Sequence, residues 1–427
     1  MNQQTLERIS LLPGVFLNFV ENDRYKTNFI TFNFVTPLNR RTSSYNTVLS
    51  RVLTRGCAAY PSQRMLNCAL DELYDASLSS DSVKIGEWHA LTVSLALLDN
   101  AMTFDGQDLS REGLALLEEV MFRPLLKDGS FCEEYVKGEK KQALLEIESL
   151  VNNKARYAKS RMIEHMCKLE PYSTCAIGTR GEINKITAES LADYYRTLLK
   201  SARIEIFFVG RFDSALIRKQ VERMLAALER DFAPLPPLSI RTKARTVKEI
   251  TETMDITQAN LVLGFRTACT IYDPSWRAMS LYNAVLGGSL TSKLFCVLRE
   301  KMSLCYSISS SPDALKGIMS IYAGIAPENR QVAIGEALNQ MDEIRKGNIT
   351  PEELESARGA LIHSLRGLQD NPEILADWYL PRILADNFQT PDQIIEELNT
   401  LTAEDVVKVS EGITLDTVYT LTGKEEK

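Results

Sequence analysis

The sequence predicts an α+β fold made of two tandem homologous domains, and three observations lead to this prediction. The chain of 427 residues exceeds what one hydrophobic core usually serves, so two domains of about 200 residues are expected. The order of strand-like and helix-like segments in the first half recurs in the second half. A proline-rich stretch, APLPPLSI at 233–240, precedes the basic RTKAR at 241–245, which is typical of a linker. We therefore expect an N-terminal domain at 1–233, a linker at 234–246 and a C-terminal domain at 247–427.

The composition excludes several classes of function. Hydrophobic residues make up 44% and charged residues 25% of the chain, which is ordinary for a globular protein. The net charge of -7 argues against binding to nucleic acid or to an acidic membrane surface. The eight cysteines are scattered without a CxxC pair, which disfavours a zinc ribbon and fits a reducing compartment.

The N-terminal segment is predicted to be structural and not a targeting signal. It lacks a basic leading region, and Glu7 and Arg8 precede the apolar run at 9–20. Pro13 and Gly14 interrupt that run, so we expect a strand and its turn instead of a signal peptide or a membrane span. The expected location is therefore cytoplasmic, with no membrane partner.

The first half opens with strands and helices that follow from residue pattern. β-branched and aromatic residues predict strands at 15–20 and 28–35, joined by the polar turn 21–24. Apolar residues at helical spacing and at alternating spacing then predict two helices and two more strands. These are helices at 43–53 and 62–73 and strands at 78–85 and 89–98.

Helical spacing dominates the rest of the first half. A long helix at 132–151 carries Glu139 and Glu146 seven residues apart, which places both side chains on one face. Thr187 is a favourable N-cap for a later helix. The other elements of this region are helices at 111–120, 154–166 and 191–199 and a strand at 204–209.

The second half repeats this order after the linker. The corresponding pairs are 260–266 with 28–35, 273–286 with 43–53, 292–301 with 62–73, and 417–422 with 204–209. The capping sequence Thr402-Ala-Glu-Asp also echoes Thr187-Ala-Glu-Ser, and further helices are expected at 331–346 and 351–368. Copies of about 210 residues indicate a duplicated α+β unit and not a solenoid, whose repeats span roughly 20 to 50 residues.

The segment 283–311 holds a candidate binding pair. It is predicted to form a helix, a Gly-Gly break, a second helix and a strand, with Arg299 near the end of the second helix and Tyr306 in the strand. A planar cation with five donors beside a phenol hydroxyl could clamp a peptide carbonyl or a carboxylate. A purely structural role is the alternative, because the helix dipole favours Arg at this end and Tyr is an ordinary strand residue.

Three motifs carry a resemblance to a known family. They are LGGSLTSKLF at 286–295, the segment from Leu298-Arg-Glu-Lys to Tyr306-Ser, and GTRGEINKIT at 178–187. In this order and spacing, over essentially the whole length, the sequence resembles the pitrilysin or insulinase-type zinc peptidases, the inverzincins. The resemblance implies two tandem α+β domains that form half of a clamshell, each an antiparallel-rich sheet covered by helices.

The zinc motif of that family is absent here. Family members carry H-x-x-E-H on a helix, where two His bind zinc and the Glu is the general base. The resemblance places Thr47, Ser50 and Arg51 where the first His, the Glu and the second His belong. The only histidines are His89, His165 and His363, so the motif cannot be written in any register. Arg51 would also set a permanent cation where a dication should bind.

The remaining candidate metal ligands are expected to have other roles. Glu146 matches the family's third zinc ligand and Glu139 an upstream helix Glu, so with Thr47, Ser50 and Arg51 they outline a degenerate metal site. Without His neighbours, we expect both glutamates to be relics or salt-bridge partners of Arg51. His89, ahead of an apolar strand, and His165, without a second His at helical spacing, are expected to be packing or surface residues.

These observations lead to a functional prediction. Arg299 and Tyr306 match the Arg and Tyr with which the family's C-terminal domain holds the substrate carbonyl. Some bacterial members resemble heterodimers in which one chain supplies zinc and the other this pair. The resemblance therefore implies a non-catalytic subunit without a cofactor of its own. Its expected partners are a zinc-bearing paralogue and a peptide or unfolded polypeptide substrate.

Two alternatives remain beside this prediction. The chain could be a structural or peptide-holding subunit of a larger complex with no proteolytic role. A self-sufficient hydrolase is disfavoured, because no Ser, Cys or metal constellation with an identifiable spacing replaces the lost site.

Overall fold

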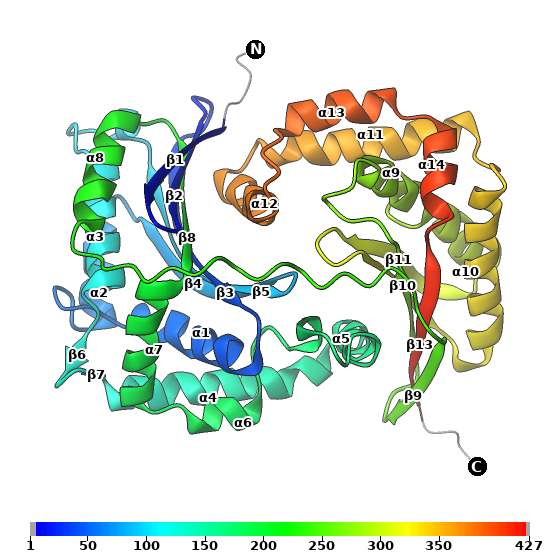
Figure 1. Cartoon of the computed structure of the whole chain (residues 1–427), viewed down its shortest axis with the longest axis horizontal. Helices are drawn as coiled ribbons and strands as arrows, with labels where there is room; N and C mark the ends of the chain where they lie inside the picture. Colours follow the sequence, from blue (N-terminus) through cyan, green and yellow to red (C-terminus); the bar gives the residue numbers. More distant parts are fainter. Residues whose placement is uncertain (1–5, 424–427) are drawn as a thin grey trace. The chain divides into compact units, whose positions relative to one another are not determined.

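The computed structural model describes residues 6–423. Residues 1–5, which begin the segment predicted not to be a signal peptide, and residues 424–427 lie outside the described part. The predicted α+β class with helix-covered sheets is confirmed, and the chain divides into two compact units (Figure 1). The first unit holds the described residues up to Glu148, Thr174–Pro237 and Leu368–Pro381, and the second holds Ser149–Ser173, Leu238–Gly367 and the described residues from Arg382.

The sheet of the first unit has six strands in the order β1-β2-β8-β3-β5-β4. They are β1 (Leu6–Leu12), β2 (Val15–Glu21), β3 (Thr27–Pro37), β4 (Ser77–Ile85), β5 (Trp88–Leu98) and β8 (Arg203–Gly210). The β2–β8 pair is parallel and the other pairs are antiparallel. Ile30, Phe32 and Phe34 of β3 enter one hydrophobic core, because alternate strand residues face the same side. A separate hairpin consists of β6 (Leu126–Lys127) and β7 (Ser130–Phe131).

Helices pack onto this sheet and share its core. They are α1 (Arg40–Leu53), α2 (Gln63–Glu72), α3 (Leu109–Phe122), α4 (Glu133–Ser149), α6 (Arg180–Lys185), α7 (Ala188–Ser201) and α8 (Ser214–Leu225). Capping boxes at Asn39 and Thr187 fix the starts of α1 and α7. The rings of Tyr45 and Tyr194, whose centroids are 4.9 Å apart, join these two helices.

The sheet of the second unit has five strands in the order β11-β12-β10-β13-β9. They are β9 (Lys248–Met254), β10 (Ala259–Arg266), β11 (Cys305–Asp313), β12 (Ile318–Ile325) and β13 (Thr414–Gly423). This order matches β4-β5-β3-β8-β2 of the first unit, including the parallel outer pair β13–β9. The predicted duplication is therefore confirmed at the level of topology.

One helix of the second unit begins with the same kind of N-terminal cap as a helix of the first unit. The helices of the second unit are α5 (Lys154–Met166), α9 (Trp276–Leu286), α10 (Arg330–Arg345), α11 (Pro351–Leu368), α13 (Pro391–Thr400) and α14 (Ala403–Ser410). Thr402 caps α14 with a capping box, as Thr187 caps α7. α12 (Pro372–Leu384) crosses the boundary between the units. Single 3-10 turns occur at Asn100–Met102, Leu150–Asn152, Pro171–Ser173 and Pro327–Asn329.

The two units exchange one segment each, which the continuous domains expected from the sequence do not include. Ser149–Ser173, with α5, belongs to the second unit, and Leu368–Pro381 belongs to the first. α5 lies so close to the second sheet that a Cβ on Gly264 of β10 would meet the sulfur of Met162 at 2.5 Å. The chain passes from the first unit to the second between Pro237 and Leu238, inside the expected linker 234–246.

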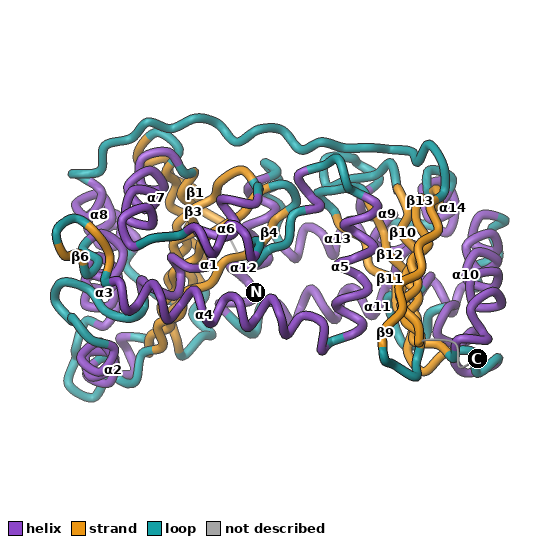
Figure 2. Tube along the Cα trace, turned by 90° about the horizontal axis from the view of Figure 1, so that it is seen from below, coloured by secondary structure: helices purple, strands orange, loops and turns teal. Residues whose placement is uncertain are grey.

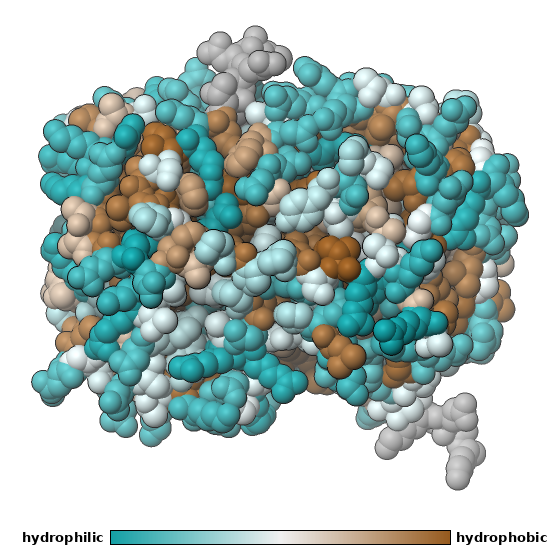
Figure 3. Space-filling view, in the orientation of Figure 1, coloured by the Kyte–Doolittle hydropathy of each residue, from teal (hydrophilic) through white to brown (hydrophobic). Residues whose placement is uncertain are grey.

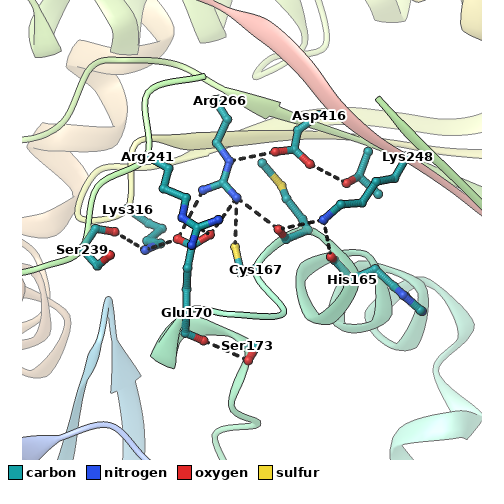
Figure 4. A network of polar contacts seen from close by, with 12 residues as sticks. His165, Cys167, Glu170, Ser173, Ser239, Arg241, Lys248, Arg266, Lys316 and Asp416 are labelled. Carbon is teal, nitrogen blue, oxygen red and sulfur yellow. Dashed lines mark hydrogen bonds and ion pairs between the residues drawn. The ribbon is translucent and has the colours of Figure 1, made fainter. Parts of the chain in front are cut away.

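A buried network of charges fixes the exchanged segment to the second sheet (Figure 4). Glu170, which follows α5, accepts from Arg266 Nη2 of β10 at 2.9 Å and lies 2.5 Å from Lys316 Nζ. Arg266 Nε also donates to Asp416 of β13 at 3.0 Å. Burial raises the pKa of Glu170, but the hydrogen bonds from Arg266 and Lys316 outweigh it and hold the pKa below its usual value. The carboxylate is therefore charged at neutral pH.

The connection between α8 and β9 contains no helix or strand, and Figure 2 draws it as one long loop. Hydrophilic side chains cover most of the face seen in Figure 3, with apolar side chains scattered between them. Among the described residues, no helix is both long and apolar enough to cross a membrane.

Candidate functional site

The positions that match the zinc motif lie on α1 in the first unit, and their side chains are already engaged. Thr47 and Ser50 are buried. The Thr47 hydroxyl lies 2.9 Å from the Ser82 hydroxyl of β4, and Ser50 donates to the Thr47 carbonyl at 3.1 Å. The Thr47 hydroxyl therefore stabilises the contact between α1 and the edge of the sheet, whereas the Ser50 hydroxyl is used within α1.

Two ion pairs bridge α1 and α4 where a metal would be expected. Arg51 of α1 contacts the Glu146 carboxylate, as expected from the sequence. Glu139 does not pair with Arg51, because Arg55, in the turn just after the end of α1, donates to it through Nε at 2.6 Å. Arg55 Nη1 also donates to Gln63 at 2.9 Å.

The residues present do not fit a zinc ion. Zinc sites need neutral His, thiolate or free carboxylate ligands, whereas Arg51 brings a permanent positive charge and occupies Glu146. Between residues 6 and 423, no group of three or more His, Cys, Asp and Glu side chains is placed to hold a metal. The bridge between the two helices is thus electrostatic and needs no metal.

His89 is a buried structural residue beside this region, in agreement with the role expected for it. Its Nε2 lies 2.9 Å from the Ala176 carbonyl, which can only accept, so Nε2 carries the proton. Nδ1 therefore accepts from Asn46 Nδ2 at 2.9 Å, and Asn46 Oδ1 accepts from the Tyr194 hydroxyl at 2.7 Å. Burial lowers the pKa of His89 to about 4, so the ring is neutral at pH 7. The Asn46 and Tyr194 contacts could not be predicted from the sequence, because they join segments that are far apart in the chain.

Arg299 lies in the second unit on a π-helix (Phe295–Lys301), which differs from the ordinary helix expected at 292–301. The backbone bond from Met302 N to Val297 O, at 2.9 Å, spans five residues and shows the wider turn. Ser303 then adopts a left-handed conformation with φ of 53°. Wide turns of this kind concentrate at functional sites.

The glycine break before this helix permits a close approach to β11. Ser310 N donates to the Gly287 carbonyl at 2.9 Å, and a Cβ on Gly287 would meet Ser310 Oγ at 2.7 Å. Only glycine therefore fits at this position. The contact fixes the loop that precedes Arg299 against the strand that carries Tyr306.

Tyr306 is the extra residue of a β-bulge on the edge strand β11. Cys305 pairs with Ile325 and Ser307 with Gly324, so Tyr306 has no partner of its own on β12. A bulge redirects the side chain of its extra residue, and Tyr306 is 73% exposed while Cys305 is buried. Burial raises the pKa of the Cys305 thiol, and the positive charge of Arg299 opposes this rise.

Arg299 and Tyr306 keep their hydrogen-bonding groups available. The Arg299 guanidinium lies 4.6 Å from the centroid of the Phe295 ring. Within the described residues, neither Arg299 nor Tyr306 makes a side-chain hydrogen bond or an ion pair. This contrasts with Arg51 and Arg55, whose donors are taken up by glutamates. The π-helix and bulge thus present a guanidinium and a phenol that can bind a carbonyl or carboxylate oxygen.

The chain resembles known proteins in both sequence and fold. Residues 185–361 match the family model of the peptidase M16 inactive domain. The chain is 28% identical over 412 residues to a Bacillus subtilis protein named probable inactive metalloprotease YmfF, with 96% of each chain covered. It is 25% identical over 248 residues to an uncharacterized zinc protease, SCO5738 of Streptomyces coelicolor, covering 56% of this chain and 53% of that one.

Two solved structures share the fold over the full length. A conserved protein of Enterococcus faecalis V583 has a TM-score of 0.91 and 26% identity, with 99% of both chains covered. A Pseudomonas fluorescens structure described as a peptidase M16 inactive domain has a TM-score of 0.79 and 18% identity, with 99% of both chains covered.

The duplicated fold, together with the ion pairs of Arg51 and Arg55 at the expected metal site, defines a metallopeptidase-like protein without a zinc motif. The match to the inactive-domain model includes both Arg299 and Tyr306. The family resemblance predicted from the sequence is confirmed: residues 185–361 match the peptidase M16 inactive domain, and the chain is similar over nearly its full length to a probable inactive metalloprotease.

Proposed function

We propose that this chain is the non-catalytic subunit of a heterodimeric zinc metallopeptidase. It contributes Arg299 and Tyr306 to a peptide-hydrolysing chamber whose zinc lies on a partner chain, a paralogue that carries H-x-x-E-H. The chain itself takes no cofactor and acts in the cytoplasm on peptides or unfolded polypeptide segments.

The contrast between Arg51 and Arg55 on the one side and Arg299 on the other carries this proposal. Arg51 and Arg55 are neutralised by Glu146 and Glu139 at the positions where zinc would be bound. Arg299, by contrast, has no carboxylate partner in the described residues and lies on an exposed, irregular helix. A guanidinium without a carboxylate partner in its own chain supports a role in binding an oxygen atom of a peptide substrate.

The proposed role of the pair is to bind the oxygen of the scissile carbonyl. Arg299 can donate N–H bonds to it and Tyr306 can donate its O–H. Negative charge grows on this oxygen during the reaction, so both bonds strengthen in the transition state, and this lowers the barrier. Tyr306→Phe should therefore affect the rate more than substrate binding.

The edge strand β4 supports a peptide as the substrate. β4 ends the sheet of the first unit and pairs only with β5 among the described strands. An open edge binds an extended peptide through backbone hydrogen bonds, which tolerates many sequences. The bond between Thr47 and Ser82 ties this edge to α1, beside the degenerate metal site.

Reconstitution with the zinc-bearing paralogue of the same genome tests the proposal. We expect the chelator-washed chain to bind less than about 0.1 equivalent of zinc and to hydrolyse no peptide, since isolated zinc sites need three protein ligands. The mixture should cleave a quenched fluorescent peptide in proportion to the complex formed. Equal activity of the paralogue with and without this chain would overturn the proposal.

A structural or peptide-holding subunit without proteolytic role is the second candidate. The observation that favours it is the two ion pairs that connect α1 and the turn after it to α4, because they stabilise the site without metal. Stable assembly with a large complex that contains no H-x-x-E-H protein would select this candidate.

A further inference from the structure

A protruding loop of the first unit exposes an aromatic side chain almost completely. Phe104, in the connection between β5 and α3, is 96% exposed, and the neighbouring Met102 is also exposed. An aromatic ring this exposed adds little to the hydrophobic core of its own chain. Rigid aromatic side chains are, however, frequent anchors of protein interfaces.

The loop holds this ring in a fixed position. The Tyr74 ring stacks on Phe104 with a centroid distance of 6.3 Å. The Tyr74 hydroxyl accepts from Phe104 N at 3.2 Å and donates to Asp105 Oδ1 at 3.0 Å. Gln107 N donates to the same carboxylate oxygen at 3.2 Å. A preorganised anchor loses little conformational entropy on binding, which favours an interface role.

We call the exposed Phe104 side chain, with Asp105 next to it, the knob. A pocket that we call the socket lies close to it in the same unit. It is a pocket of ≈ 410 Å³ between the N-terminal ends of α3 and α8. Its apolar floor includes Phe212 and Leu216, and Leu216 is 60% exposed. Asn100 and Asp108 line it, each four residues from Phe104, so knob and socket are at most about 14 Å of chain apart.

The rim of the socket carries positive charge without partners. Arg111, Lys219 and Arg223 line it, and none of their side chains makes an ion pair or hydrogen bond to the described residues. The two acids of the lining are engaged as helix N-caps: Asp108 accepts from Arg111 N and Asp213 from Ala215 N.

The knob offers the complementary chemistry, a phenyl ring followed by the carboxylate of Asp105. Hydrogen bonds from Gln107 N and then Tyr74 keep the pKa of Asp105 below its usual value, so it is charged at neutral pH. The knob therefore matches the socket in both shape and sign: the ring fits the apolar floor and the carboxylate fits the basic rim. A cavity of about 150 Å³ already holds benzene, so the volume is sufficient.

We propose that a second copy of this chain docks here, with the Phe104 knob of each copy in the socket of the other. Knob and socket lie close together on one unit, so a two-fold axis can bring both into a single interface, in which the contact occurs twice. The interface lies on the helical side of the first unit, on α3 and α8, and does not use Arg299 or Tyr306. It is thus independent of the proposed catalytic partnership.

Analytical ultracentrifugation from about 1 to 200 μM tests the proposal, a range that spans weak dimers. We expect a monomer–dimer equilibrium for the wild type. Because a hot-spot side chain contributes roughly 30-fold or more and occurs twice, Phe104→Ala should raise the dimer Kd about 1000-fold. Leu216→Arg should do the same by filling the socket. The matched control is Leu169→Ala, at another exposed site with 83% exposure.

Mixing the two defective variants provides the sharpest arm of the test. A heterodimer of Phe104→Ala and Leu216→Arg keeps one intact knob-and-socket contact, whereas each homodimer keeps none. Native mass spectrometry should therefore show the heterodimer as the dominant dimer in the mixture. A wild type that stays monomeric at 200 μM, or a Phe104→Ala dimer of unchanged Kd, would overturn the proposal. So would a monomer that binds neutral lipid vesicles only when Phe104 is present.

Discussion

Replacing Glu170 by Gln should strongly destabilise the second unit. The substitution keeps the size of the side chain but removes the charge that contacts Arg266 and Lys316, whose side chains are 2% and 0% exposed. Removing one partner of a buried ion pair costs about 3 to 5 kcal/mol, because the remaining charges stay desolvated. Glu164→Gln is the matched control: this carboxylate pairs with Arg161 but is 54% exposed, so its loss should cost less than about 1 kcal/mol.

Urea denaturation followed by circular dichroism measures both free energies of unfolding. We also expect amide hydrogen exchange in α5 to increase in Glu170→Gln, because Glu170 fixes the segment after α5 to β10. A loss below about 1 kcal/mol in Glu170→Gln, equal to that of the control, would refute the reasoning that this network holds the exchanged segment.

Two further predictions concern the first unit. The pKa of His89 is about 4 in the folded chain and about 6.5 when unfolded, so the unfolded chain takes up the proton first. The free energy of unfolding should thus fall by roughly 3 kcal/mol from pH 7 to below pH 4 through this residue, and His89→Gln should flatten that part of the profile measured by denaturation. The triple change Thr47→His, Ser50→Glu and Arg51→His should raise bound zinc to about one equivalent, by mass spectrometry of the metal, and adding Glu146→Gln should lower it again. Equal zinc in the triple and quadruple variants would contradict the assigned register.

Much of the fold follows from local sequence pattern. β-branched and aromatic residues identified β3, and the capping sequences at Thr187 and Thr402 marked two equivalent helix starts, because these signals depend on neighbours in the chain. The repeated order then implied a duplicated topology, which the strand orders of the two sheets bear out.

The features that were missed depend on contacts between distant residues. The exchange of Ser149–Ser173 rests on Glu170 meeting Arg266 and Lys316, which no local pattern reveals. The pairing of Glu139 with Arg55 depends on how α1 and α4 face each other.

The candidate site shows the same limit. Periodicity indicated a helix around Arg299 but could not distinguish a π-helix, which differs only in its hydrogen bonds. The bulge at Tyr306 depends on the pairing of β11 with β12. The residue types were therefore identifiable from the sequence, while their exposure was not.

Steady-state kinetics of the reconstituted heterodimer test the central claim most directly. With the zinc-bearing subunit in saturating amounts, Arg299→Ala and Tyr306→Phe should each lower kcat/KM about 10 to 150-fold, as expected for a charge-assisted hydrogen bond of about 1.5 to 3 kcal/mol. Lys301→Ala, which removes an exposed cation from the same π-helix, should leave kcat/KM within about twofold. Wild-type kcat/KM in both Arg299→Ala and Tyr306→Phe would contradict the account.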